Sequence, residues 1–186
     1  MIELVITITV ILVLMVLALP SFNSFQQRSK LRGAGDQALG FWNQARLEAA
    51  KRNQLVKVGV SGSGAEFCLG ATTTTIDALD HDTPCDCQTA GACDVATFGA
   101  DQAEWRGVTL NGTPTLGEDS GVAVIEPKRT ALINPDMAGT ISFNGPTGHK
   151  SYRLNLRVDR LGRGALCQST SAPDEMSDYV NRECAE

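Results

Sequence analysis

Positive charge is missing from the start of the chain, where no Lys or Arg precedes Arg28. A cleaved secretory signal peptide begins with a positively charged segment and ends at a site of small residues. The first charged side chain here is the acidic Glu3, and the sequence LALPSF is a poor cleavage site. These absences argue against a signal peptide, although the opening residues are strongly apolar.

The chain also lacks the motifs on which common enzymes depend. Its two histidines, His81 and His149, do not stand in a nucleophile motif. No G-x-S-x-G sequence and no phosphate-binding loop occurs. We expect neither catalysis nor a bound cofactor.

The residues from Ile2 to Leu19 are apolar except for Glu3, Thr7 and Thr9. A helix that crosses a bilayer needs about 20 apolar residues, which this run nearly supplies. A buried core helix is the alternative, but it needs a partner surface that a chain of 186 residues hardly offers. We expect residues 1–20 to form a membrane span.

Glu3 then has two interpretations. A carboxylate in hydrocarbon costs about 2.5–3.5 kcal/mol, so such a group is usually paired or functional. Alternatively, Glu3 lies at the headgroup boundary, where water solvates it and it has no role.

An amphipathic pattern follows Pro20, which lacks a backbone N–H and is expected to end or kink the first helix. Residues 21–54 predict an amphipathic continuation that ends near Asn53, so the expected layout is one long helix. Its apolar face repeats at Leu31, Ala34, Ala38, Trp42, Ala45 and Ala49. A bend is expected where glycine costs about 1 kcal/mol relative to Ala, at Gly33, Gly35 and Gly40.

The charged residues are unevenly spread along the chain. Residues 21–58 carry seven basic and two acidic side chains, whereas residues 59–186 carry nine basic and eighteen acidic ones. A basic stalk joined to an acidic head suits a chain that leaves a membrane and ends in a soluble domain. The net charge of −5 does not indicate a general nucleic-acid binder.

Residues 55–186 predict a β-rich head made of short strands separated by turns. In SYRLNLRV, the clearest strand, the side chains of Arg153, Asn155 and Arg157 face away from the apolar ones. The other predicted strands are LVKVGV, EFCL, VAVI and TISF. Residues 71–103 are rich in Thr, Asp, Gly and Cys, and we expect them to form a long variable loop.

The order IELVITITVILVLMVLALPSF resembles the N-terminal segment of type IV pilins and pseudopilins. In that family the mature protein begins Phe-Thr-Leu-Ile-Glu-Leu, and a Pro follows about one span later. Ile2, Glu3, Leu4 and Pro20 match these positions. FWNQARLEAAKRNQLVKV and GTISFNGPTGHKSYRLNLRVDRLGRGALC are similar to the helix end and the last strands of GspH/FimT-type minor pilins.

The resemblance implies an α+β fold, in which a long hydrophobic and then amphipathic N-terminal helix packs on a β-rich pilin-like head. It implies a minor pilin or pseudopilin of a type IV pilus or a type II secretion system, acting in initiation or at the tip. Its partners would be other major and minor pilins or pseudopilins, packed through the N-terminal helix. Before assembly it would be a single-pass inner-membrane protein with a periplasmic head.

The resemblance also assigns an assembly role to Glu3, whose carboxylate would meet the N-terminal amine of a neighbouring subunit. Met1 stands where the family has the third residue of the mature protein, which is normally methylated at its N-terminus. We therefore expect the coding sequence upstream of Met1 to continue in frame through Thr, Phe and Gly to a short basic leader.

Six cysteines allow fifteen disulfide connectivities, and an even count in a periplasmic head favours disulfides. We expect Cys167 and Cys184 to form a bridge that pins the C-terminal tail and contributes about 3 kcal/mol. Pairing stays open for Cys68, Cys85, Cys87 and Cys93. A metal site is the weaker alternative because C-x-C-x5-C is not a standard zinc pattern; its ligands would be Cys85, Cys87 and Cys93 with Asp80, His81 and Asp82.

DNA binding is the alternative function. Some FimT-like minor pilins bind DNA through a C-terminal Gly-Arg-x-Arg turn, but here the turn reads Gly162-Arg163-Gly164-Ala165 and lacks the second Arg. A cationic strip that makes phosphate contacts remains possible on one strand face; it would contain Lys150, Arg153, Arg157, Arg160 and Arg163.

Overall fold

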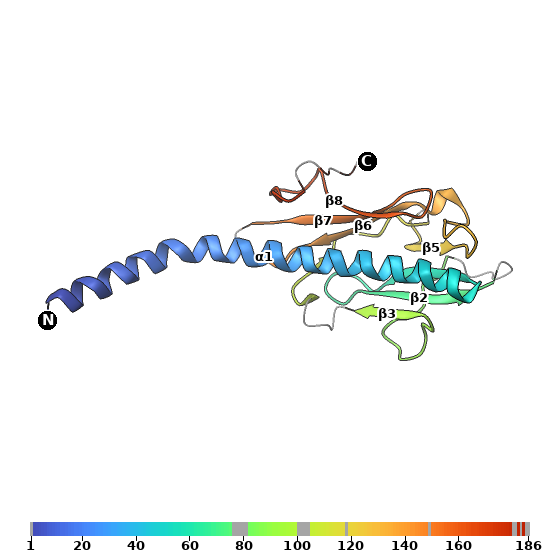
Figure 1. Cartoon of the computed structure of the whole chain (residues 1–186), viewed down its shortest axis with the longest axis horizontal. Coiled ribbons are helices and arrows are strands. Elements are labelled where there is room, and N and C mark those ends of the chain that lie inside the picture. Colours follow the sequence, from blue (N-terminus) through green and yellow to red (C-terminus); the bar gives the residue numbers. More distant parts are fainter. Residues whose placement is uncertain are drawn as a thin grey trace.

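One long helix and two antiparallel sheets make up the structure (Figure 1). The computed structural model describes residues 2–75, 82–99, 105–117, 119–148, 150–179, 182 and 184, without the side chains of residues 15–21. Helix α1 spans Ile2–Arg52 and extends beyond the head at its N-terminal end. The expected α+β class, with a long N-terminal helix packed on a β-rich head, is confirmed.

Helix α1 is continuous through Pro20, which agrees with the expected layout of one long helix; of the two effects expected of Pro20, an end or a kink, the end does not occur. A proline removes one backbone donor, and the remaining hydrogen bonds of a helix of 51 residues are enough to carry it past that position. The end of the helix agrees with the expectation, because Asn53 takes a left-handed conformation with φ of 51°. Residues in that conformation often terminate helices.

The strands form two four-stranded sheets. The first sheet has the order β3-β2-β1-β5 and the second β4-β6-β7-β8, and all pairs are antiparallel. The strands of the first sheet are β1 (Leu55–Ser61), β2 (Cys68–Thr74), β3 (Ala96–Gly99) and β5 (Val122–Ile125). Those of the second are β4 (Thr109–Leu110), β6 (Gly139–Asn144), β7 (Arg153–Val158) and β8 (Gly164–Gln168), with the short 3-10 helix η2 (Pro135–Met137) just before β6.

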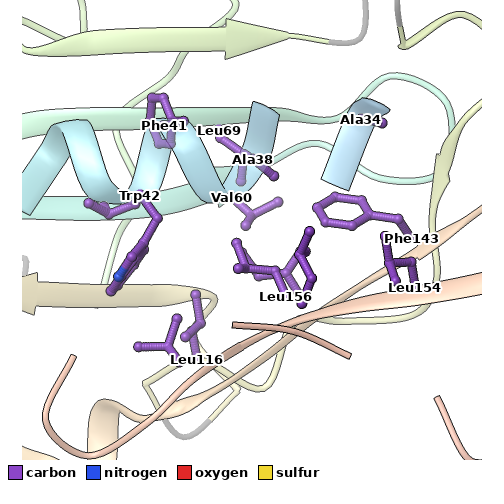
Figure 2. Close-up of a cluster of buried hydrophobic side chains, with 14 of the residues drawn as sticks. Ala34, Ala38, Phe41, Trp42, Val60, Leu69, Leu116, Phe143, Leu154 and Leu156 are labelled. Carbon is purple, nitrogen blue, oxygen red and sulfur yellow. The ribbon is translucent and has the colours of Figure 1, made fainter. Parts of the chain in front are cut away.

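The core lies where the C-terminal half of α1 meets the inner faces of both sheets. Figure 2 shows Ala34, Ala38, Phe41 and Trp42 of the helix near apolar side chains of the strands. The predicted apolar face is confirmed, since each of its members is at most 1% exposed. Four of the six are alanines, whose small side chains let the helix backbone approach the sheets closely.

Aromatic side chains gather between the two sheets, although they make up only 5% of the sequence. Trp105 lies at the centre, with ring centroids 5.3 Å from Phe67, 4.7 Å from Phe98 and 5.4 Å from Phe143. Each of these three pairs is edge-on, the geometry that the charge distribution of aromatic rings favours. The cluster therefore joins β3, β6 and the residue just before β2 across the core.

Polar contacts fix the position of the helix against the head. The indole Nε1 of Trp42 donates to the carbonyl of Gly162 at 2.9 Å, and that of Trp105 donates to Gln37 Oε1 at 2.9 Å. At the C-terminal end of α1, the Arg52 guanidinium lies 3.1 Å from Asp94 Oδ2. Because these bonds are spaced along the helix, they fix both its rotation and its position along its axis.

The strand predictions were right for LVKVGV, VAVI, TISF and SYRLNLRV, each of which contains or lies within an observed strand. The range 71–103, expected as one loop, instead begins within β2 and contains β3. The run of threonines at 72–75 is polar and lacks an apolar alternation. Its strand is held by pairing with β1 from Leu55 to Ser61.

The membrane span expected over residues 1–20 finds no support in the structure. Within the described residues, no helix contains a segment that is both long enough and apolar enough to cross a bilayer.

The glycines of α1 give a test of how closely the helix packs. A Cβ at Gly35 would overlap the Cδ2 methyl of the fully buried Leu154, whereas a Cβ at Gly33 or Gly40 would meet nothing within 4 Å. We expect Gly33→Ala and Gly40→Ala to stabilise the protein by up to about 1 kcal/mol, because Ala is the better helix former. Gly35→Ala should destabilise it by about 1–3 kcal/mol through overpacking.

Urea unfolding of the full chain in detergent, followed by circular dichroism, measures these differences. Gly33→Ala and Gly40→Ala are the matched controls, since they make the same change on the same helix. A Gly35→Ala variant as stable as the two controls would contradict the close packing of α1 on β7.

Candidate functional site

The N-terminal half of α1, residues 2–26, extends away from the head (Figure 1). We call it the free arm. All side chains from residue 2 to residue 14 are exposed, including Ile2 at 78% and Leu14 at 61%. Phe22 and Phe25, closer to the head, are also exposed. Among the side chains that the structure describes, Gln27 is the first buried one along the helix. Residues 2–14 of the free arm thus present apolar side chains around the helix.

The polar groups of the free arm are few, and two of them are satisfied within the helix. The Thr7 hydroxyl donates to the Leu4 carbonyl at 2.9 Å, and the Thr9 hydroxyl donates to the Val5 carbonyl at 2.7 Å. Glu3 is the one ionisable side chain before Arg28. Within the described residues it has no hydrogen bond or ion pair.

A second surface lies on the outer face of the sheet β4-β6-β7-β8, away from the helix. Strands β6 and β7 form its floor, and the turn between β7 and β8 closes one end. Ser169, Ser171 and Cys184 of the C-terminal segment line it as well. This cationic groove has a volume of about 840 Å³ and is lined by four arginines, Arg153, Arg157, Arg160 and Arg163.

The four arginines differ in whether an acidic side chain lies beside them. Arg163 Nε lies 2.8 Å from Asp159 Oδ2. Arg153 donates to Asn144 Oδ1 at 3.1 Å and to Ser171 Oγ at 2.9 Å, which are neutral groups. Within the described residues, Arg157 and Arg160 have no acidic partner. The groove therefore keeps a net positive charge.

Asp159 holds the turn that closes the groove. Its Oδ1 accepts the backbone N–H groups of Leu161 and Arg163, at 2.9 and 2.8 Å. Partial burial raises the pKa of this carboxyl, but the hydrogen bonds from the N–H and the guanidinium of Arg163 outweigh it. The resulting pKa lies below the ordinary value of 3.8. At neutral pH Asp159 is thus ionised and neutralises Arg163.

A chain of side-chain hydrogen bonds connects lining residues of the groove through Asn144, which lies beside it. Asn144 Nδ2 donates to Asn111 Oδ1 at 3.2 Å, and Arg153 links Asn144 to Ser171. Asn155 lies on the same face of β7, between Arg153 and Arg157, and is 8% exposed. Its Oδ1 is buried and has no hydrogen-bond partner among the described residues.

The structure brings together part of the cationic strip that the sequence suggested. Arg153, Arg157, Arg160 and Arg163 line one groove, whereas Lys150 lies outside it, with Nζ 3.8 Å from Asp174 Oδ1. The proposed assembly residues Ile2, Glu3, Leu4 and Pro20 all belong to the free arm. His149 lies outside the described residues.

Sequence analysis missed Asn155 as a candidate binding residue. The alternation of SYRLNLRV places it on the polar face of β7 but gives no indication that it is buried. Its burial comes from the walls of the groove, which are supplied by segments distant in the sequence.

All six cysteines lie within the described residues, and all form disulfides. The expected Cys167–Cys184 bridge is present and holds the C-terminal segment beside β8. The remaining pairs, left open by the sequence, are Cys68–Cys87 and Cys85–Cys93. Cys85, Cys87 and Cys93, the thiolate ligands of the alternative metal site, are all in disulfides. Asp80 and His81 lie outside the described residues.

Comparison with known proteins gives one distant structural similarity. No protein-family model and no curated protein sequence matches the chain. The crystal structure of the type IV minor pilin FimU of Pseudomonas aeruginosa strain PAO1 is similar, with a TM-score of 0.47 and 15% sequence identity. The match covers 81% of this chain and 98% of that one.

The three disulfides can be tested by their effect on stability and by peptide mapping. Replacing Cys167 and Cys184 together by Ser should lower the free energy of unfolding by about 3 kcal/mol, because the open chain gains conformational entropy. Non-reducing denaturation of the wild-type full chain should reveal no free thiol. Peptide mapping should recover Cys68 with Cys87, Cys85 with Cys93 and Cys167 with Cys184. Recovery of a Cys68–Cys85 or Cys68–Cys93 peptide would contradict the arrangement around β2.

Proposed function

We propose that this chain is a minor pilin or pseudopilin subunit, which packs through its free arm into a filament of similar subunits. The observation that carries the proposal is the run of 13 exposed residues at the start of α1. Exposed apolar surface on this scale marks an interaction site in soluble and membrane proteins alike. A bundle of similar helices offers an apolar surface of matching length.

The chemistry of the free arm supports an apolar environment. In such an environment each polar group must find a partner within the protein, and Thr hydroxyls commonly bond to the carbonyl one turn back. Thr7 and Thr9 both do so. Among residues 2–14, Glu3 is the remaining polar side chain, and this proposal gives it a partner from another chain.

Glu3 in this proposal pairs with the N-terminal amine of a neighbouring subunit. An ion pair of this kind offsets the desolvation of both groups, and a subunit in the wrong register would leave the carboxylate buried without a partner. Glu3 thus specifies register, while Ile2, Leu4 and the rest of the free arm supply apolar contact.

The cellular setting follows from the same proposal. Before assembly, the free arm would anchor the chain in the inner membrane as a single pass, with the head in the periplasm. Three disulfides support an oxidising compartment for the head. The filament would be a type IV pilus or a type II secretion pseudopilus, in which the subunit acts in initiation or at the tip after N-terminal methylation.

Replacing Glu3 tests the assembly role. Glu3→Ala should accumulate normally before assembly but be depleted from sheared filaments, because losing one member of a buried pair costs several kcal/mol. Glu3→Gln should be intermediate at best, since it keeps the shape of the side chain but not the charge. Immunoblotting of the membrane and sheared fractions measures both.

Glu48→Ala is the matched control, because it removes a carboxylate from the same helix at a place that lies on the head. Glu48 pairs with Lys51 and Arg52, so its loss should affect only the end of the helix. Normal recovery of Glu3→Ala in sheared filaments would return Glu3 to the role of a solvated group at the helix end.

DNA binding is the second candidate function, and the clustering of four arginines in one groove supports it. Phosphate contacts would make the affinity fall steeply with salt. Retention of single-stranded DNA by the full chain in detergent, at low and at moderate salt, tests this candidate. Arg157→Gln should weaken such binding, and equal retention by that variant would speak against the groove as the DNA site.

A further inference from the structure

The sequence contains two Asn-Gly dipeptides, Asn111-Gly112 and Asn144-Gly145. In such a dipeptide the glycine nitrogen can attack the carbonyl carbon of the asparagine side chain, because glycine has no Cβ to crowd the approach. A cyclic imide forms, ammonia leaves, and water opens the imide to aspartate or isoaspartate. Asn111 directly follows β4 and Asn144 ends β6, so both dipeptides lie in the same part of the second sheet.

The backbone nitrogen that would attack is available in one dipeptide and engaged in the other. Within the described residues, the Gly112 N–H donates no hydrogen bond. Gly112 is exposed, and a Cβ placed there would meet nothing within 4 Å, so there is room for the imide ring. The Gly145 N–H, by contrast, donates to the Tyr152 carbonyl at 2.9 Å. Attack by Gly145 would have to break that bond, which protects Asn144.

The side-chain carbonyl of Asn111 is also prepared for attack. Asn144 Nδ2 donates to Asn111 Oδ1 at 3.2 Å. The orientation of the Asn144 amide is fixed by Arg153, whose Nε lies 3.1 Å from Asn144 Oδ1 and can only donate. The donor end of Asn144 therefore faces Asn111. Such a donor stabilises the negative charge that develops on the oxygen during attack, as an oxyanion hole does.

We propose that Asn111 is an autocatalytic deamidation site, with the Gly112 nitrogen as nucleophile and Asn144 as the donor to the developing oxyanion. The Gly112 N–H gives its proton to a solvent base, and the nitrogen bonds to Asn111 Cγ. The bond from Cγ to Nδ2 breaks, and the side-chain nitrogen leaves as ammonia after taking a proton from solvent. One water then adds across the imide, so nothing is oxidised or reduced.

The product changes the charge of the cationic groove, which Asn111 lines. A carboxylate at position 111 adds a negative charge to a wall whose arginines give the groove its positive charge. An aspartate oxygen can still accept from Asn144 Nδ2, so that contact survives the reaction. The charge of the groove thus falls irreversibly as the molecule ages. The reaction does not involve the free arm, and the outcome of the Glu3 experiment leaves this proposal unaffected.

Incubation of the full chain in detergent, at mildly alkaline pH and in water labelled with heavy oxygen, tests the proposal. Digestion in ordinary water excludes deamidation during work-up. Tandem mass spectrometry then reads the two sites separately, because Lys128 and Arg129 place them in different tryptic peptides. We expect Asn111 to take up heavy oxygen at least about tenfold faster than Asn144.

Two further conditions identify the cause of that difference. The rate at Asn111 should rise with pH, because the attacking nitrogen must lose a proton. In urea the two sites should react at similar rates, since the bond that protects Gly145 is lost. No uptake at Asn111 in the folded chain, or uptake at Asn144 that is equally fast there, would overturn the proposal.

Variants beside the site test the two groups that act on Asn111. Gly112→Ala adds a Cβ that crowds the attacking nitrogen, and Asn144→Ala removes the donor; each should slow uptake at Asn111 at least about tenfold in the folded chain. Thr113→Ala, at the next exposed residue, is the matched control and should keep the wild-type rate. In urea Asn144→Ala should also react at the wild-type rate. Uptake at the wild-type rate or faster in folded Asn144→Ala, or an equal loss in urea, would overturn the role of Asn144.

Discussion

The rest of the structure depends on the packing of the C-terminal half of α1 against two sheets at once. The sheets share no strand, and the inner face of each is buried partly by the other and partly by the helix. Small side chains on the helix make this possible, because Ala34, Ala38, Ala45 and Ala49 are all fully buried. The same helix continues beyond the head, where the side chains of residues 2–14 are exposed. One helix therefore has a head-facing half that completes a core and a free arm that needs a partner.

The outer face of one sheet is covered, and that of the other is open. On the first sheet, Gly59 lies against Pro84, and Gly70 lies against the bridge between Cys85 and Cys93, so a disulfide-bonded loop covers that face. Side chains at these two glycines would collide with the loop. On the second sheet, the outer face carries polar side chains and stays open as the cationic groove. Antiparallel sheets commonly have one solvated face.

The C-terminal segment connects the disulfides to the groove. Cys184 is bonded to Cys167 on β8, and the main chain pairs again where the Gln168 N–H donates to the Arg182 carbonyl at 2.9 Å. This segment brings Ser171 to Arg153, which it could not reach if the tail were loose. The shape of the groove thus rests on a covalent bond as well as on the sheet.

The sequence by itself determined the features that depend on local pattern. The apolar face of α1, the end of the helix near Asn53 and the alternation of β7 all follow from periodicity and turn chemistry, which act over a few residues. The Cys167–Cys184 bridge was also predicted, because these two cysteines frame a short loop. One long helix was predicted as well, but whether Pro20 ends or kinks its first half stayed open, because local rules count the lost donor and not the hydrogen bonds on either side.

Only the tertiary structure decided the features that depend on distant segments. The pairing of Cys68 with Cys87, the strand at 96–99 and the gathering of four arginines into one groove need chain segments far apart in the sequence to lie side by side. The burial of Asn155 is the clearest case. Its neighbours in sequence place it on a polar strand face, but walls from the β7–β8 turn and the C-terminal segment turn that face into a groove. Burial is a property of three-dimensional packing, and no local pattern of residue types specifies it.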